Sequence, residues 1–189
     1  TQMLNIALAA SPSTQFEFFN GSCSALDGGT PGISQVLMPA GQSQVSLRLR
    51  AKLAGAYTVT ADANKGTPPT LAVTVTAGPA SRLVLSPAVV ALIRNTCSSG
   101  TITVSTTDDF DNPAVPAADV PVTFTSTPST GLSVFAGSDT ACATTAPTIT
   151  VPASSGSAQL HLKASVAQQF TLTPATTTMG ITGVPRQVS

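Results

Sequence analysis

The residues best suited to chemistry are four acidic side chains in one loop-like stretch. Asp108, Asp109 and Asp111 are almost consecutive and adjoin Asn112, and Asp119 follows shortly after. Hard oxygen ligands at alternate positions of a loop can bind Ca²⁺. The same residue types also cap backbone groups and fix turns between strands. The sequence therefore leaves two interpretations, a calcium site or a structural turn, and no other cofactor is expected.

The three cysteines point to covalent bracing. None belongs to a Cys-x-x-Cys pair, so zinc-ribbon and thioredoxin-type sites are not expected. Cys97 precedes an expected strand at 101–105, and Cys142 follows one at 132–135. We predict a disulfide between these two cysteines, and two buried reduced thiols are the alternative. A disulfide would indicate an oxidising compartment.

The chain has few residues suited to catalysis. The single histidine, His161, lies in a run whose alternation places Ala158, Leu160 and Leu162 inward, so His161 is expected to point outward. No Gly-x-Ser-x-Gly nucleophile motif accompanies it. We therefore expect no enzymatic activity.

The composition indicates which elements position these residues. Of 189 residues, 42% are hydrophobic and only 8% are charged, with eight Lys+Arg against eight Asp+Glu. A net charge of zero argues against nucleic acid and anionic membranes as partners. The longest apolar stretches, near 7–10 and 89–93, are too short to span a membrane. Abundant Thr, Ser and Val with few helix formers predict an all-β protein.

An internal repeat divides the chain. The stretch 39–61 matches 152–174 without a gap, so that Tyr57 corresponds to Phe170 at an offset of 113 residues. Upstream, 11–22 matches 127–138 at an offset of 116. A repeat of this length is close to one immunoglobulin-like sandwich of ~100 residues. We expect tandem sandwiches, the first spanning 1–78 and the second 79–189, joined at Ala77-Gly78-Pro79-Ala80-Ser81.

Period-two patterns predict the strands of the second sandwich. They lie at 82–85, 89–93, 101–105, 120–125, 132–135, 148–151, 157–163, 169–173 and 182–188.

The first sandwich is expected to be incomplete. Residues 1–8 align with the strand at 120–124, so nothing corresponds to 79–118. Either the chain belongs to a longer array, or another molecule supplies the missing strands to an open sheet edge. Cys23 corresponds to Cys142, and its partner would lie in the missing half. We therefore expect Cys23 to be unpaired or to form an intermolecular bond.

Several segments carry a resemblance to a known family. GPASRLVLSP at the joint, the stretch 108–126, Cys97-Ser98-Ser99-Gly100 and AGAYTVTA at 54–61 resemble bacterial immunoglobulin-like repeats of invasin- and intimin-type adhesins and of large surface proteins. The resemblance implies a β-sandwich, an extracellular or cell-surface setting, and a spacer or adhesive role.

Two functions follow from these expectations. The first is a structural spacer, stalk or fibre subunit whose partners are neighbouring repeats or copies of itself. The second is an adhesin module that binds a carbohydrate or a cell-surface receptor. Aromatic residues make up only 4% of the chain, which disfavours a carbohydrate platform.

Overall fold

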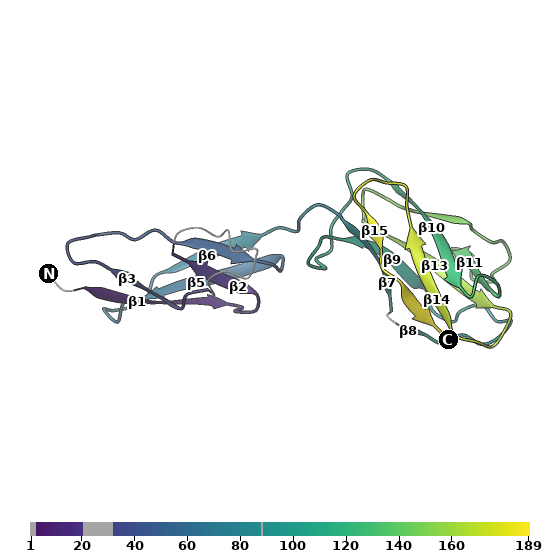
Figure 1. Ribbon diagram of the computed structural model, residues 1–189, viewed down its shortest axis with the longest axis horizontal. Helices are drawn as coiled ribbons and strands as arrows, with labels where there is room; N and C mark the ends of the chain where they lie inside the picture. Colours follow the sequence, from purple (N-terminus) through teal and green to yellow (C-terminus); the bar gives the residue numbers. More distant parts are fainter. Residues whose placement is uncertain (1–2, 21–31, 88) are drawn as a thin grey trace. The chain divides into compact units, whose positions relative to one another are not determined.

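The protein folds into two all-β units. The computed structural model describes residues 3–20, 32–87 and 89–189, and every regular element among them is a strand (Figure 1). The chain divides into Thr1–Thr76 and Ala77–Ser189, close to the joint expected from the sequence. Among the described residues, no helix has the length and apolar character needed to cross a membrane.

The second unit is a sandwich of two five-stranded sheets. One sheet has the order β12-β10-β14-β16-β8, and the other β11-β13-β9-β7-β15. Its strands are β7 (Arg82–Ser86), β8 (Val89–Val90), β9 (Ile102–Thr107), β10 (Val120–Thr127), β11 (Leu132–Ala136), β12 (Thr148–Val151), β13 (Ser157–Ala164), β14 (Phe170–Ala175), β15 (Thr182–Gly183) and β16 (Arg186–Val188).

Alternating side chains from both sheets form the core of this sandwich. Val120 and Val122 of β10 and Leu160 and Leu162 of β13 are fully buried, as the alternation predicts, and Phe170 of β14 packs with them. Successive side chains of a strand point to opposite faces, so one face of each sheet supplies the core. The prediction of an all-β sandwich is confirmed.

The end of the chain departs from the expected single strand at 182–188. β15 pairs with β7 in one sheet, whereas β16 pairs with β14 in the other. Pro185 lies between the two strands, and proline cannot donate a ladder hydrogen bond. The last segment therefore crosses from one sheet to the other instead of continuing in one ladder.

The first unit contains fewer strands. A four-stranded sheet has the order β3-β1-β5-β6, and a two-stranded sheet pairs β2 with β4. The strands are β1 (Leu4–Ser11), β2 (Phe16–Phe19), β3 (Gln35–Met38), β4 (Arg48–Ala51), β5 (Gly55–Asp62) and β6 (Thr70–Val75). Its core consists of Leu8, Phe16, Phe18, Val36 and Tyr57.

The strand pairings of the first unit recur in the second. Leu4 pairs with Met38 as Val120 pairs with Val151, which preserves both repeat offsets. The β1–β5 and β2–β4 ladders match β10–β14 and β11–β13 in the same way. Strands β1 to β6 of the first unit thus have the connectivity and pairing of β10 to β14 and β16.

Backbone hydrogen bonds outside the strands recur as well. The N–H of Lys52 donates to the carbonyl of Gln15 at 3.2 Å, and Ser165 donates to Gly131 at 2.8 Å. Gln15 and Gly131 both have positive φ, 55° and 98°. The turn therefore uses the left-handed region in both units, and glycine adopts this region without a steric penalty.

One aromatic position distinguishes the two cores. The hydroxyl of Tyr57 donates to the carbonyl of Leu53 at 2.8 Å, whereas Phe170, at the corresponding position, has no hydroxyl. Tyr57 also packs against Phe16, with ring centroids 4.7 Å apart.

The substitution Tyr57→Phe tests the value of this hydrogen bond. We expect the free energy of unfolding of the first unit to fall by about 1 kcal/mol, because the packing is kept and one hydrogen bond is lost. Calorimetric scans of the whole chain measure this change, and the transition of the second unit serves as the internal control. An unchanged first transition would show that water replaces the bond without loss.

Candidate functional site

Asp108 is the centre of the acidic loop and is buried, with 4% of its surface exposed. Its Oδ1 accepts the backbone N–H groups of Phe110 at 2.9 Å and Asn112 at 3.0 Å. Its Oδ2 accepts the Gly78 N–H at 2.9 Å and the Asn112 side-chain amide at 2.8 Å. Both carboxylate oxygens are thus used in holding the loop and the start of the second unit.

These hydrogen bonds stabilise the charged form of Asp108. Burial by itself would raise the pKa of this carboxyl, but the bonds from Asn112, Gly78 and Phe110 outweigh it and lower the pKa to about 2. The folded state therefore favours the ionised carboxylate. Its stabilising contribution is complete above the ordinary pKa near 3.8 and is lost as the pH falls through about 2.

Asp108→Ala should therefore destabilise the second unit and flatten its acid response. We expect the free energy of unfolding at pH 7 to fall by about 2 kcal/mol, after allowance for solvent near the loop. Between pH 4 and pH 2 the variant should lose less stability than the natural protein. Urea unfolding at a series of pH values measures both effects. Asp109→Ala is the matched control, because Asp109 is exposed and should change neither quantity by more than ~0.5 kcal/mol.

The structure does not gather the four acidic residues into a cation site. Asp109 accepts a bond from Ser81 at 2.6 Å, Asp111 pairs with Arg82 at 2.7 Å, and Asp119 accepts the Ala153 N–H at 2.8 Å. Within the described ranges, no group of three or more His, Cys, Asp or Glu side chains could hold a metal ion. The calcium interpretation does not fit this geometry, because the central carboxylate already accepts four N–H bonds. The interpretation as a structural turn does fit this geometry.

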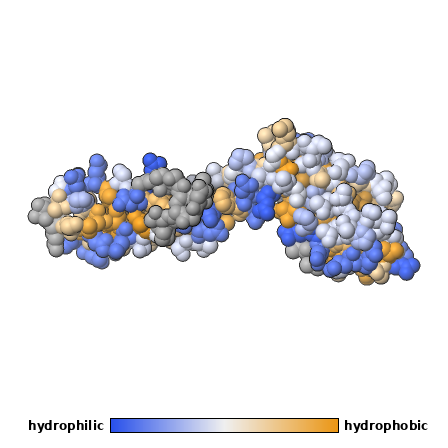
Figure 2. All heavy atoms as spheres, in the orientation of Figure 1, coloured by the Kyte–Doolittle hydropathy of each residue, from blue (hydrophilic) through white to orange (hydrophobic). Residues whose placement is uncertain are grey.

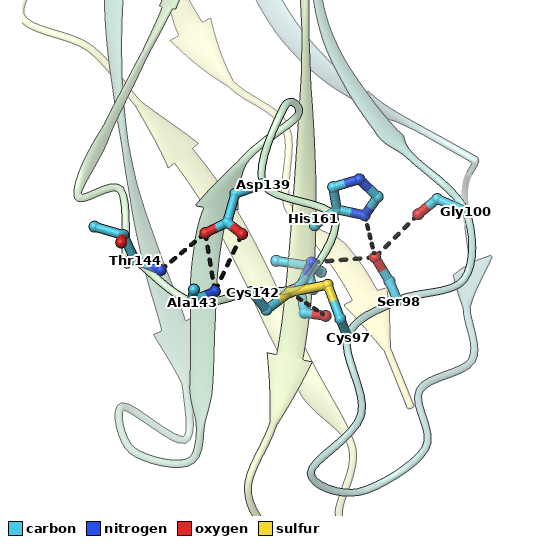
Figure 3. The surroundings of a disulfide bond; sticks show 9 residues. Cys97, Ser98, Gly100, Asp139, Cys142, Ala143, Thr144 and His161 are labelled. Atoms are coloured by element: carbon cyan, nitrogen blue, oxygen red, sulfur yellow. Dashed lines mark hydrogen bonds between the residues drawn. A yellow bond between two sulfur atoms is a disulfide. The ribbon is translucent and has the colours of Figure 1, made fainter.

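A disulfide joins Cys97 to Cys142, the two cysteines whose pairing the sequence predicts (Figure 3). The sulfur atoms are 2.05 Å apart, the Cα atoms 5.5 Å apart, and 45 positions separate the residues in sequence. Cys142 is buried and has a φ of 51°, which is unusual for a residue other than glycine. Cys23 lies outside the described residues.

Asp139 shapes the loop that carries Cys142 (Figure 3). Its carboxylate accepts the N–H groups of Thr144 at 2.8 Å and Ala143 at 2.9 Å. These two bonds lower the pKa of Asp139. The loop is therefore held from within, independently of the covalent link.

His161 lies on the outer face of β13, as the alternation predicts, but this face is not open to solvent. His161 is only 4% exposed, and its Nδ1 lies 3.0 Å from the Ser98 hydroxyl. The alternation was correct, since Leu160 and Leu162 face the core, but the outer face is covered here. The Ser98 N–H donates to the Leu162 carbonyl at 2.8 Å, and this bond holds the loop that carries Cys97 along β13. Phe135 of the neighbouring strand β11 lies opposite His161.

The contacts of the Ser98–His161 pair are those of a structural link within the fold. The Ser98 hydroxyl also lies 3.0 Å from the Gly100 carbonyl and accepts the Leu162 N–H at 3.3 Å. A hydroxyl with three neighbours inside the fold is not presented to a substrate. The pair links the disulfide loop to β13. Ser98 and His161 are 63 positions apart in the sequence, so a local sequence pattern could not identify their contact.

Sequence reasoning also missed a groove on the second unit, with both charged and apolar residues in its walls. Its volume is about 510 Å³, and Arg82, Thr107, Asp111 and Arg186 contribute to its walls. Thr107 is 6% exposed. In the part of the chain that the structure describes, neither its Oγ1 nor the buried Arg186 Nε has a hydrogen-bond partner. Buried polar atoms normally have partners, so these two atoms are exceptions within the described part of the fold.

Comparison with known proteins gives similarity of structure only. No protein-family description matches the chain, and no curated protein matches it in sequence. A glycosyl hydrolase family 2 member from Bacteroides cellulosilyticus covers 98% of this chain at 12% identity and a TM-score of 0.46, and 23% of that protein is matched. Domains 4 and 5 of the S-layer protein SbsC cover 97% at 14% identity and a TM-score of 0.38, with 69% of that chain matched.

A β-glycosidase from Bacteroides vulgatus covers 98% of the chain at 17% identity and a TM-score of 0.43. The chain spans about a fifth of the length of the glycosidases that it matches. These neighbours are all-β parts of bacterial surface proteins and glycosidases.

Proposed function

We propose that the chain is a non-enzymatic structural protein of a bacterial surface, built from immunoglobulin-like sandwiches that space or support other domains or assemble into a fibre. The observation that carries the proposal is that the reactive side chains serve as structural contacts. Asp108 holds a loop, His161 is buried against Ser98, and Cys97 is bonded to Cys142. Groups that catalysis would need are engaged inside the fold.

The disulfide supports the extracellular setting. Structural disulfides persist in secreted proteins and are rare in the reducing cytosol. This crosslink bridges two loops of the complete sandwich, where it stabilises the fold and leaves no redox-active cysteine pair close in sequence.

Surface labelling of intact cells tests the proposal. A membrane-impermeant biotin reagent should label the protein on whole cells, and a non-reducing digest should yield the linked Cys97–Cys142 peptide. A cytosolic control protein must stay unlabelled. Recovery of the protein in the cytosolic fraction with both thiols reduced would overturn the proposal.

The groove lined by Arg82 and Arg186 favours a second candidate, an adhesin module that binds a carbohydrate or a cell-surface receptor. Arg82 and Arg186 line this groove, and the Arg82 guanidinium pairs there with Asp111. Binding on a glycan array that disappears with Arg186→Ala would support it. Arg48→Ala, in the other unit, is the control and should bind as the natural protein does.

A further inference from the structure

In the second unit, the first segment, which carries β7 and β8, runs beside the last segment, which carries β15 and β16. β7 pairs in parallel with β15, so that Arg82 lies opposite Thr182. β8 pairs in parallel with β16, so that Val90 lies opposite Val188. Among the described strands of this unit, every other ladder is antiparallel. The two parallel ladders are therefore the places where the beginning of the unit holds its end.

The two segments hold each other in both sheets (Figure 1). In the sheet β11-β13-β9-β7-β15, the late strand β15 lies at the edge and is bound by the early strand β7. In the sheet β12-β10-β14-β16-β8, the early strand β8 lies at the edge and is bound by the late strand β16. Neither segment can therefore slide out of the sandwich without breaking a ladder in each sheet.

Backbone hydrogen bonds extend both ladders. The Val184 N–H donates to the Leu83 carbonyl at 2.9 Å, just beyond the end of β15. The Ser189 N–H donates to the Val90 carbonyl at 2.9 Å, and the Leu92 N–H donates to the Ser189 carbonyl at 2.6 Å. Hydrogen bonds between parallel strands are evenly spaced along the ladder. The contact between the two segments thus continues to the last residue of β16 and beyond it.

Apolar side chains of both segments also lie in the core. Leu83 and Leu85 come from the first segment, Ile181 and Val188 come from the last, and all four are at most 9% exposed. The visible face of this unit is mostly polar to neutral, in keeping with apolar side chains that lie inside (Figure 2). Sliding one segment past the other would therefore expose apolar surface as well as break hydrogen bonds.

The direction of the strands determines how a pull on the two ends of the unit is resisted. The chain enters β7 at Arg82, beside Thr182, and leaves β16 at Ser189, beside Val90. Because the paired strands are parallel, these two points lie at opposite ends of the ladders. Tension between them draws the two segments past each other along the strands. All the bonds of both ladders then bear the load together, whereas a pull from one end would open them one after another.

We propose that the second unit bears tension along the chain, and that the ladders β7–β15 and β8–β16 are the clamp that resists this tension. The inference rests on the proposed structural role and deepens it, because it names the contacts through which a surface spacer would withstand pulling. Forced unfolding is governed by the rate of unfolding and not by the equilibrium stability. The rupture force should therefore depend on this clamp more than on the core.

Single-molecule force spectroscopy on the whole chain, with two pairs of attachment points, tests the clamp. One pair is positions 1 and 189. In the other, the second handle is an azide-bearing amino acid in place of Met179, which is 96% exposed. The Thr182 N–H donates to the Ser81 carbonyl at 2.9 Å, so a pull from position 179 opens the β7–β15 ladder from its first bond. We expect the second unit to rupture at a force about twofold lower from position 179 than from position 189.

The rupture of the second unit is identified by its disulfide. Its step in length should grow when dithiothreitol opens the bond between Cys97 and Cys142, whereas the step of the first unit should stay the same.

Variants test the clamp with both handles at the chain ends. Val184→Pro removes the N–H that donates to Leu83, and Val184→Ala is the matched control, because it shortens the side chain and keeps the N–H. We expect the proline variant to rupture at a lower force than the alanine variant. Leu162→Ala, in the core and outside the clamp, should lower the melting temperature more than Val184→Pro and the rupture force less.

Equal rupture forces from positions 179 and 189 would overturn the inference. A rupture force that follows the melting temperature across the three variants would also overturn it. If the proline variant does not fold, the comparison of the two pulling positions still decides, because it uses the natural fold. A protein that is labelled at the cell surface and ruptures equally from both positions would retain the proposed function and lose only this inference. A protein that ruptures as expected and is recovered with reduced thiols from the cytosol would retain the clamp and lose the surface role.

Discussion

Removal of the disulfide by the paired substitution Cys97→Ala and Cys142→Ala is expected to lower the free energy of unfolding of the second unit by about 4 kcal/mol. The crosslink closes a loop of 45 positions, and such a loop restricts the unfolded chain by roughly that amount. For a unit of this size the loss corresponds to a fall in melting temperature of about 15 °C. Calorimetry of the whole chain measures it.

Reduction supplies the control for this prediction. Dithiothreitol should bring the melting temperature of the natural protein down to that of the paired variant and leave the variant itself unchanged. The transition of the first unit should stay constant in both samples. A paired variant that melts like the natural protein would show that loop bonds, such as those of Asp139, suffice to hold this region.

The second large effect is a difference between equivalent leucines. Leu162→Ala should lower the free energy of unfolding of the second unit by about 3 kcal/mol, because a fully buried side chain leaves a cavity. Leu49→Ala, at the corresponding position of the first unit, should lower that unit's stability by only about 1 kcal/mol, because Leu49 is partly in water already.

Urea unfolding of both single variants and of the natural chain measures this difference. Equal losses would mean that Leu49 is as well covered as Leu162 in solution.

The sequence predicted much of the fold because alternation and internal repetition are local signals. The alternation in β13 identifies Leu160 and Leu162 as core residues, and the structure buries both. The strand at 182–188 is different. Its pattern continues through Pro185, but the chain there changes sheets, and a period of two carries no information on which sheet a residue joins.

The candidate site was less predictable, because it depends on contacts between distant segments. His161 alternates as an outward residue, yet a loop 63 positions away covers it with Ser98. Asp108 belongs to a group that suggests calcium, and only the approach of Gly78 and Asn112 shows that its oxygens serve the backbone. Composition identifies candidate ligands, whereas tertiary packing determines whether their lone pairs are available.

The covalent link also sets a limit on mechanical extension. If the second unit were pulled from its two ends, the segment between Cys97 and Cys142, with strands β9, β10 and β11, would stay looped after the rest had unravelled. At ~3.4 Å per extended residue, the intact crosslink withholds roughly 150 Å of contour length. Under tension, a tether made of such units would lengthen by a smaller amount as each unit unfolds, because the crosslinked segment of each unit would not extend.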